Sequence, residues 1–129
     1  MKEGKELSLM DKYNHLFSKH FLGFETPNGW DWVVEKYLEK TQWDVEKNNL
    51  KIEIIQIKEK FGQLRIYTYC PEDESNKYIL DDENCAYCAA LADYTCERCG
   101  CLTKEKQYTK GWITGLCPEC FKERQNETK

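Results

Sequence analysis

Two C-x-x-C pairs near the end of the chain constrain its fold more than any other feature of the sequence. Cys96 and Cys99 form the first pair, and Cys117 and Cys120 form the second after 17 intervening residues. Four thiolates in such pairs can surround one Zn²⁺ ion tetrahedrally at about 2.3 Å, and this separation is typical of Cys₄ sites. Gly100, directly after the first pair, suits the tight turn of a metal knuckle. The sequence therefore predicts a zinc ribbon with these four cysteines as its metal ligands.

The predicted metal site is closed, because protein sulfur takes all four coordination positions. A closed Cys₄ site is structural rather than catalytic, and the folding of its segment depends on the metal. We expect the ribbon to occupy residues 95–122 and to hold about one zinc ion per chain. Within it, residues 111–115 predict a short strand that leads into the second cysteine pair.

The chain has eight cysteines, so four lie outside the predicted metal site. The N-terminal residues lack the apolar run that is typical of an export signal, so we expect metal binding rather than disulfides to explain the high count. Cys85 and Cys88 form a third C-x-x-C pair, but they fall in a predicted helix, where a spacing of three places both on one face. We interpret them as buried core residues. Two alternatives stay open: a second metal site that includes Cys70 or Cys101, and a redox pair.

Hydrophobic periodicity predicts three helices before the ribbon. The clearest one runs over residues 29–44, where apolar side chains at helical spacing form a stripe that suits packing on a sheet. Two others are expected at residues 9–21 and 76–94, with an exposed acidic loop at residues 72–74 before the last of them. A short polar helix is expected after Cys120.

Strand signals cluster in the middle of the chain. Residues 50–54 alternate between apolar and charged side chains, and the alternation slips at residues 54–55, which indicates either a β-bulge or a strand covered on both faces. A second strand is expected over residues 64–69, after a turn at Phe61-Gly62. The pattern predicts an α+β domain over residues 8–94, in which helices pack on a small antiparallel β-sheet, followed by the C-terminal Cys₄ zinc ribbon.

The charge balance limits the classes of partner. The chain carries 19 Lys and Arg against 23 Asp and Glu, a formal net charge of −4 and a pI of about 5.3. This balance disfavours a duplex-DNA binder that depends mainly on neutralising phosphates. No apolar run approaches the ~18 residues that cross a bilayer, so we expect a cytoplasmic protein without a membrane partner. The sequence does not predict its oligomeric state.

No catalytic motif stands out in the sequence. The H-E-x-x-H, P-loop and G-x-S-x-G patterns are absent. The two histidines, His15 and His20, are five residues apart and would point to different sides of a helix. We therefore expect a protein that is not an enzyme.

The predicted hairpin carries the first candidate ligand-binding site. Its residues, with one from the ribbon, are Lys58, Lys60, Phe61, Arg65, Tyr67 and Trp112. Cations and aromatic rings in one pocket suit an anionic ligand such as a nucleotide. Arg65 and Tyr67 have the same parity in the second strand, which places them opposite the core face. The plainer alternative is a solvated hairpin whose charges prevent pairing with another chain.

A second candidate site lies in the ribbon. Its basic and aromatic residues are Arg98, Lys104, Lys106, Tyr108, Lys110 and Trp112. Such clusters suit single-stranded nucleic acid, so a nucleic-acid-binding regulator is an alternative function. A structural accessory protein with no dedicated ligand is a second alternative.

Short motifs spread over residues 12–120 occur together in one kind of protein. The most specific are the KEKFG-LR segment at residues 58–65 and the TCE-CG segment at residues 95–100, accompanied by Gly29-Trp30 and by LCPEC at residues 116–120. Together they resemble small proteins encoded by bacteriophages and prophages that end in a zinc finger. The resemblance implies a phage origin and a zinc module, and it implies no established activity.

These features give one leading hypothesis for function. The chain is expected to be a non-enzymatic, zinc-containing phage binding protein in the cytoplasm of an infected bacterial cell. It would act on the host, in counter-defence or takeover, by binding a host protein or by sequestering a small anionic or nucleotide ligand.

Overall fold

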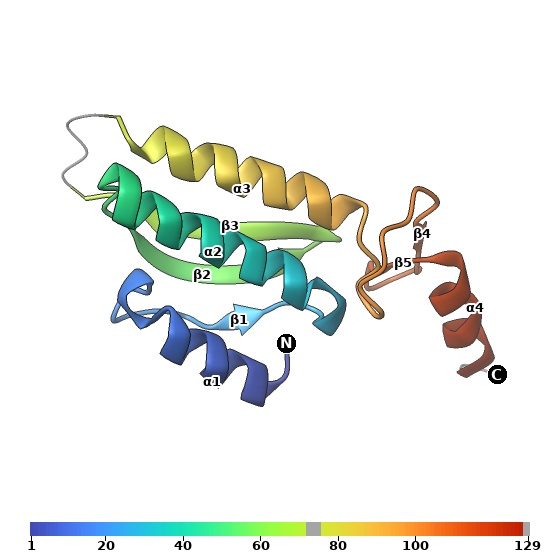
Figure 1. The fold of residues 1–129 in the computed structure, drawn as a ribbon. Helices are drawn as coiled ribbons and strands as arrows, with labels where there is room; N and C mark the ends of the chain where they lie inside the picture. The colour runs from blue at the N-terminus through green and yellow to red at the C-terminus, as the bar shows by residue number, and fades with distance from the viewer. Residues whose placement is uncertain (72–75, 128–129) are drawn as a thin grey trace.

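The computed structural model describes residues 1–71 and 76–127, which form the predicted α+β fold with a cysteine-rich C-terminal segment (Figure 1). The acidic loop expected at residues 72–74 lies outside the described residues. The elements in chain order are α1 (Glu3–Lys12), η1 (Asn14–Leu16), β1 (Phe24–Glu25), η2 (Asn28–Trp30), α2 (Asp31–Asn48), β2 (Glu53–Lys60), β3 (Gln63–Tyr69), α3 (Tyr78–Asp93), β4 (Gln107–Tyr108), β5 (Gly115–Leu116) and α4 (Pro118–Glu127).

The central sheet has the strand order β1-β2-β3 and is mixed rather than purely antiparallel. β2 and β3 form the predicted antiparallel hairpin, and the expected bulge is confirmed by a register shift between Ile54 and Gln56. β1 pairs parallel to β2, with Phe24 opposite Ile57. The sequence did not reveal β1, because two residues are too few to show the alternation of a strand.

The turn of the β2–β3 hairpin holds both of its central residues in the left-handed region. Phe61 has φ 54° and Gly62 has φ 79°, the combination that a two-residue type I′ turn requires. The Gly62 backbone N–H donates a hydrogen bond to the Glu59 carboxylate at 2.8 Å. This tight turn projects the Phe61 ring outward, where 71% of the residue is exposed.

Two long helices, α2 and α3, cover one face of the sheet (Figure 1). Both were predicted, and α2 buries its apolar stripe completely. The fully buried members of that stripe are Val33, Val34, Tyr37 and Leu38. Within the described residues, no helix is both long and apolar enough to span a bilayer.

The helix expected at residues 9–21 is wrong in its position. The chain instead forms α1 over Glu3–Lys12, followed only by the short 3-10 turn η1. Lys5 and Lys12 on α1 form ion pairs with Glu35 of α2, with N–O distances of 2.9 and 3.6 Å. The polar N-terminal residues are helical because they pack against α2, a tertiary contact that apolar periodicity does not register.

A layer of polar side chains is buried between α2, α3 and the sheet. The Tyr37 hydroxyl donates a hydrogen bond to one Asp81 oxygen at 2.6 Å, and the Thr68 hydroxyl donates to the other at 2.7 Å. The Asn84 side-chain amide donates to the Tyr37 carbonyl at 3.1 Å. Each buried polar group here has a partner, so the layer fixes how the two helices pair.

Replacing Tyr37 by phenylalanine is expected to lower the free energy of unfolding by about 1–2 kcal/mol, because buried Asp81 loses one of its donors. Burial, together with the electrostatic effect of the neighbouring Cys85 and Asp81, raises the pKa of Tyr37 well above its ordinary value. An unfolded tyrosine loses its proton near pH 10 while folded Tyr37 keeps it, so its stabilising contribution declines as pH rises above about 10. Urea unfolding at several alkaline pH values should show a shallower decline for the variant; parallel profiles would contradict this assignment.

The start of α2 joins the sheet domain to the cysteine-rich segment. Trp30 is fully buried, and its indole N–H donates to the Thr95 carbonyl at 3.1 Å. The Gly29 backbone N–H donates to the Glu97 carbonyl at 2.9 Å. These contacts place the first cysteine pair directly against the beginning of the helix.

Candidate metal centre and ligand cleft

The first cysteine knuckle is built around two glycines. The Gly100 backbone N–H donates to the Cys96 carbonyl at 3.0 Å, and the Cys96 N–H donates to the Cys101 carbonyl at 2.9 Å. Gly100 has φ 80°, and a Cβ at this position would lie 2.8 Å from the Gly29 carbonyl oxygen. The Trp32 indole N–H donates to the Gly100 carbonyl at 2.9 Å. The knuckle therefore requires glycine for both its backbone conformation and its contact with the core.

The second knuckle combines a short strand with a helix start. The strand expected at residues 111–115 is mostly wrong, because β5 consists only of Gly115–Leu116 and the residues before it form a loop. Cys117 follows β5, and Pro118 opens α4 at the first helical position, where a missing N–H does no harm. The Cys120 backbone N–H donates to the Cys117 sulfur at 3.4 Å.

The two knuckles bring four sulfur atoms to within 4.8 Å of one another. The group consists of Cys96, Cys99, Cys117 and Cys120. Tetrahedral ligands about 2.3 Å from a metal lie about 3.8 Å apart, and the Cys99 and Cys117 sulfurs are 3.9 Å apart. Burial alone would raise the pKa of Cys96, but backbone N–H groups directed at its sulfur outweigh that effect and lower the pKa to about 7. The four cysteines fit a single metal ion.

The second metal site considered for Cys70 or Cys101 does not form in the part of the chain that the structure describes. Across residues 1–71 and 76–127, no other group of three or more metal-ligating side chains comes together. Cys101 is exposed beside the first knuckle, and Cys70 packs partly buried against the main hydrophobic core.

The interpretation of Cys85 and Cys88 as core residues is confirmed. Cys88 is fully buried, and Cys85 packs partly buried against the same core. The Cys85 thiol donates to Asp81 and the Cys88 thiol donates to Asn84, each with a donor–acceptor distance of 3.7 Å. Burial raises the pKa of Cys88 to about 11. These are protonated packing groups rather than reactive thiolates.

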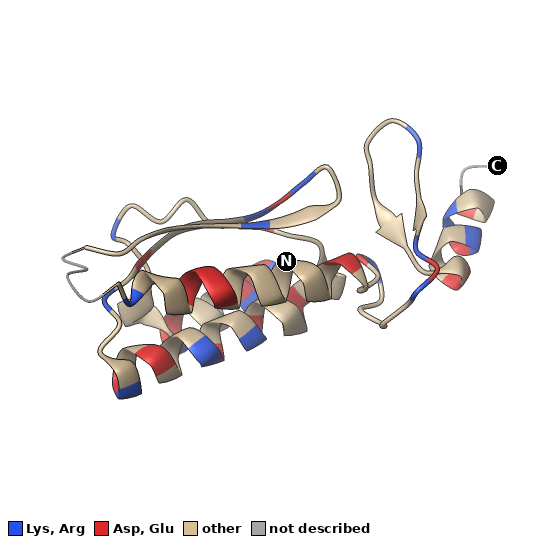
Figure 2. Ribbon diagram, turned by 90° about the horizontal axis from the view of Figure 1, so that it is seen from above, with Lys and Arg blue, Asp and Glu red and all other residues tan. Residues whose placement is uncertain are grey.

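A cleft of about 500 Å³ opens between the tip of the β2–β3 hairpin and the β4–β5 loop. Figure 2 shows the hairpin and this loop facing each other across the gap. The lining residues are Glu25, Lys58, Glu59, Lys60, Phe61, Gly111, Trp112 and Ile113. The cleft therefore exists only because the cysteine-rich segment docks beside the sheet.

The loop that carries Trp112 is held by its own hydrogen bonds. The Thr109 hydroxyl donates to the Trp112 carbonyl at 2.6 Å and accepts the Thr114 N–H at 2.9 Å. At the other side of the cleft, a Cβ on Gly62 would lie 3.4 Å from an Ile113 methyl carbon, so the loop touches the hairpin turn. The exposed Trp112 ring is thus presented by a loop with a defined conformation.

The structure brings together four of the six ligand-binding candidates. Lys58, Lys60, Phe61 and Trp112 line the cleft. Arg65 and Tyr67 do not line it. They are exposed on the sheet face opposite the core, as their parity predicts, and Arg65 donates to the Gln63 side chain at 2.8 Å.

Acidic residues at the cleft were missed in the sequence. Glu25 lies beside Lys58 because β1 pairs with β2, and nothing in the sequence signalled that pairing. Glu59 accepts the Gly62 N–H and so belongs to the turn. Neither Lys58 nor Lys60 forms an ion pair with a described residue, and the Lys60 ammonium lies 5.7 Å from the centre of the Phe61 ring. Both ammonium groups are available to a ligand.

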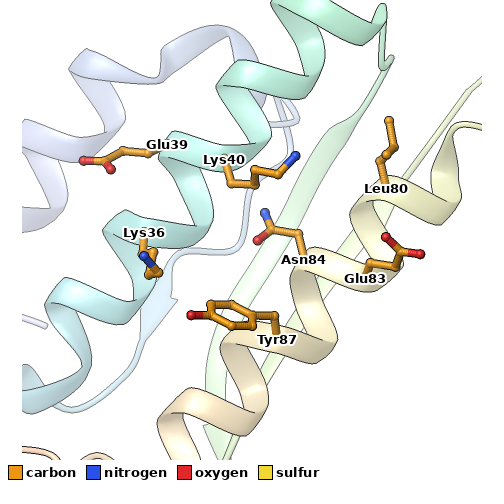
Figure 3. Close-up of a pocket in the computed structure, with 7 residues that line it drawn as sticks. All are labelled: Lys36, Glu39, Lys40, Leu80, Glu83, Asn84 and Tyr87. Carbon is orange, nitrogen blue, oxygen red and sulfur yellow. The ribbon is translucent and has the colours of Figure 1, made fainter.

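A groove of about 520 Å³ lies between α2 and α3 (Figure 3). Its lining residues are Lys36, Glu39, Lys40, Leu80, Glu83, Asn84 and Tyr87. Charges of both signs face it, and Lys40 is paired with Asp44 at 2.5 Å. The Asn84 amide N–H groups are bonded to the Tyr37 carbonyl and the Thr41 hydroxyl. Asn84 thus ties the two helices together, and the groove lacks the pair of highly exposed aromatic rings found at the hairpin cleft, which is therefore the better ligand site.

The basic cluster predicted in the ribbon does not act as one surface. Arg98 forms ion pairs with Glu123 and Glu127 of α4, with N–O distances of 4.0 and 2.6 Å. The half-buried Lys106 ammonium donates to the Ala92 carbonyl at 2.9 Å. These two cations stabilise the fold, whereas Lys110 lies in the exposed loop beside Trp112.

Comparison of the chain with protein-family models, with curated proteins and with solved structures gives no match. The chemistry of the two sites is therefore the basis for assigning a function. One site is a four-cysteine centre that can hold a metal ion, and the other is an aromatic, lysine-bearing cleft that this centre supports.

Proposed function

We propose that this chain is a non-enzymatic zinc protein that binds a small anionic ligand with an aromatic ring, of the nucleotide class, in the cleft between the β2–β3 hairpin and the β4–β5 loop. One observation carries this proposal. Phe61 and Trp112 are 71% and 79% exposed, and they line the same cleft as Lys58 and Lys60. Large apolar rings gathered at a concave surface are typical of a binding site, whereas apolar side chains scattered singly over a surface are not.

The lining supplies the two interactions that a nucleotide needs. The Phe61 and Trp112 rings offer flat apolar faces on which a base can stack, at roughly 1–3 kcal/mol per base. The Lys58 and Lys60 ammonium groups offer charge-assisted hydrogen bonds to phosphate oxygens. The type I′ turn and the Thr109 hydrogen bonds hold both walls in place, which reduces the entropy lost on binding.

In this proposal the metal is zinc and its role is structural. Tetrahedral thiolate sites suit zinc or iron, and a closed Cys₄ site in a ribbon is typical of structural zinc, because four protein ligands leave no position for substrate. The metal holds the two knuckles together, and the knuckles carry the β4–β5 loop that forms one wall of the cleft.

The biological setting follows from the resemblance to phage-encoded proteins. In an infected bacterial cell, a protein that sequesters a nucleotide would remove a signal or a metabolite from the host. The concave, aromatic cleft supports this small-ligand form of the hypothesis over the binding of a host protein, which would favour a broader and flatter surface.

Replacing Trp112 by alanine is expected to weaken nucleotide binding roughly 5- to 100-fold, because one stacking wall is lost. Calorimetric titration of the zinc-loaded protein with AMP and ADP measures this effect. Trp43→Ala is the matched control, because Trp43 is also exposed, at 56%, but lies on α2 outside the cleft. No binding to the native protein, or equal losses in the two variants, would refute the proposal.

A further inference from the structure

A second groove, of about 400 Å³, lies on the other side of the β4–β5 loop, against α4. Figure 2 shows this loop between the β2–β3 hairpin and α4. The residues that line the second groove are Tyr108, Thr109, Lys110, Phe121, Arg124 and Gln125. They include two cations and two aromatic rings, and there is no carboxylate among these described lining residues.

The cations of the second groove are not held in ion pairs within the described part of the chain, although the Arg124 guanidinium acts electrostatically on Glu97 and also lines a neighbouring pocket with Glu97 and Glu127. Neither Lys110 nor Arg124 forms an ion pair with a described residue, although α4 is rich in glutamate. Glu123 and Glu127 pair with Arg98 instead, away from the groove lining. An unpaired guanidinium beside an ammonium is an arrangement that binds phosphate, because the planar guanidinium can donate two parallel hydrogen bonds.

The second groove and the cleft meet at the tip of the loop. Lys110 lines the groove and the next residue, Gly111, lines the cleft. Trp112 is only two residues beyond Lys110, so their Cα atoms are at most about 7 Å apart. A linear ligand that leaves the cleft over the loop tip therefore enters a groove of the same aromatic and cationic character.

We propose that the physiological ligand is a single-stranded oligonucleotide, with one base stacked in the cleft and a neighbouring phosphate held by Lys110 and Arg124 in the second groove. This proposal rests on the proposed function, because it extends the same cleft. A mononucleotide would leave the second groove unused. A duplex would keep its bases stacked on one another and could not use the Trp112 and Tyr108 rings.

Binding of the zinc-loaded protein to 5′-AMP and to six-nucleotide adenylate strands, as RNA and as DNA, tests this inference by calorimetry. At least one strand is expected to bind about tenfold or more tightly than AMP, with an affinity that falls as salt rises. Arg124→Ala should weaken binding of that strand about tenfold and leave AMP binding unchanged. Lys122→Ala, on the same helix but outside the groove lining, should change neither affinity.

The outcomes separate this inference from the proposed function. If AMP binds but neither strand binds more tightly, or if Arg124→Ala leaves the affinity for the strand unchanged, the oligonucleotide inference is overturned while the cleft remains a nucleotide site. If neither AMP nor a strand binds, both proposals fail. Equal binding of a duplex of the same sequence or of hexaglutamate would also overturn the inference, because it would show a general affinity for polyanions.

Discussion

Replacing Cys117 by serine is expected to abolish metal binding and to unfold the segment from residue 95 to residue 127. The small hydrophobic cluster of this segment contains Leu116 and three of the four cysteines that could hold the metal ion. Little apolar surface is therefore left to hold β4, β5 and α4 together once the metal is lost. Structural zinc sites contribute about 10–16 kcal/mol of apparent binding free energy, which is folding free energy in a segment of this kind.

Elemental analysis and two-dimensional NMR of the purified variant measure this effect. The native protein should contain about one zinc ion per chain, and the Cys117→Ser variant should contain none, with collapsed signal dispersion for the ribbon residues. Cys101→Ser is the matched control, because Cys101 is a neighbouring thiol outside the four-sulfur group. Retention of a full zinc equivalent by Cys117→Ser, with an unchanged spectrum, would show that this cysteine is not a ligand.

Replacing Gly29 by alanine should have the second largest effect, because this glycine forms the joint between the core and the metal centre. A Cβ at Gly29 would lie 2.2 Å from the Cys96 carbonyl oxygen and 2.6 Å from the Glu97 carbonyl carbon. Both obstacles are backbone atoms, so the knuckle or the start of α2 must move. We expect a loss of roughly 3 kcal/mol in the free energy of unfolding and a weaker affinity for zinc.

Gly4→Ala is the control for this experiment. Gly4 lies in α1, and a Cβ there would meet no atom within 4 Å. Alanine should therefore stabilise the helix by up to about 1 kcal/mol. Urea unfolding of both variants should move the midpoint in opposite directions. A Gly29→Ala midpoint as high as that of the native protein would mean that the joint is looser than the contacts indicate.

The Cys117→Ser and Gly29→Ala substitutions should also disturb the ligand cleft. Trp112 and Ile113 belong to the β4–β5 loop, and that loop is positioned by the two cysteine knuckles and by the contact of Gly29 with Glu97. Chelation of the metal should therefore remove nucleotide binding together with the structure of the ribbon. The hairpin wall, which is part of the sheet, should survive.

Local patterns explain which parts of this fold could be predicted from the sequence. The apolar stripe of α2, the alternation in β2 and β3 and the two C-x-x-C pairs are all encoded within short segments. The slip at residues 54–55 even located the bulge. Each of these features can be identified from residues that are close together in the chain.

The missed elements depend on contacts between distant segments. β1 is two residues long and exists because it pairs beside β2. The helix α1 buries Leu9 in the main core, and its Lys5 and Lys12 form ion pairs with Glu35 of α2. Periodicity within a short window carries no information about such contacts, so α1 was placed too late in the chain.

The residues of the candidate site divide in the same way between those that local patterns predict and those that depend on contacts between distant segments. The hairpin predicted Lys58, Lys60 and Phe61 as neighbours, and Trp112 joins them across the cleft. Arg65 was grouped with them by chain proximity. It lies directly opposite Lys58 in the β2–β3 pairing, on the same open face of the sheet, but it does not line the cleft. The second groove could not be foreseen, because it requires α4 to pack beside the β4–β5 strands.

The most direct test of the central claim is a map of amide shifts in ¹⁵N-labelled, zinc-loaded protein as AMP is added. The proposal predicts saturable shifts at Phe61, Gly62 and residues 111–113, together with the indole N–H signal of Trp112. It also predicts that the α2/α3 groove around Lys36 and Tyr87 stays unchanged. Shifts centred on that groove, or no shifts at millimolar AMP, would contradict the assignment of the cleft as the ligand site.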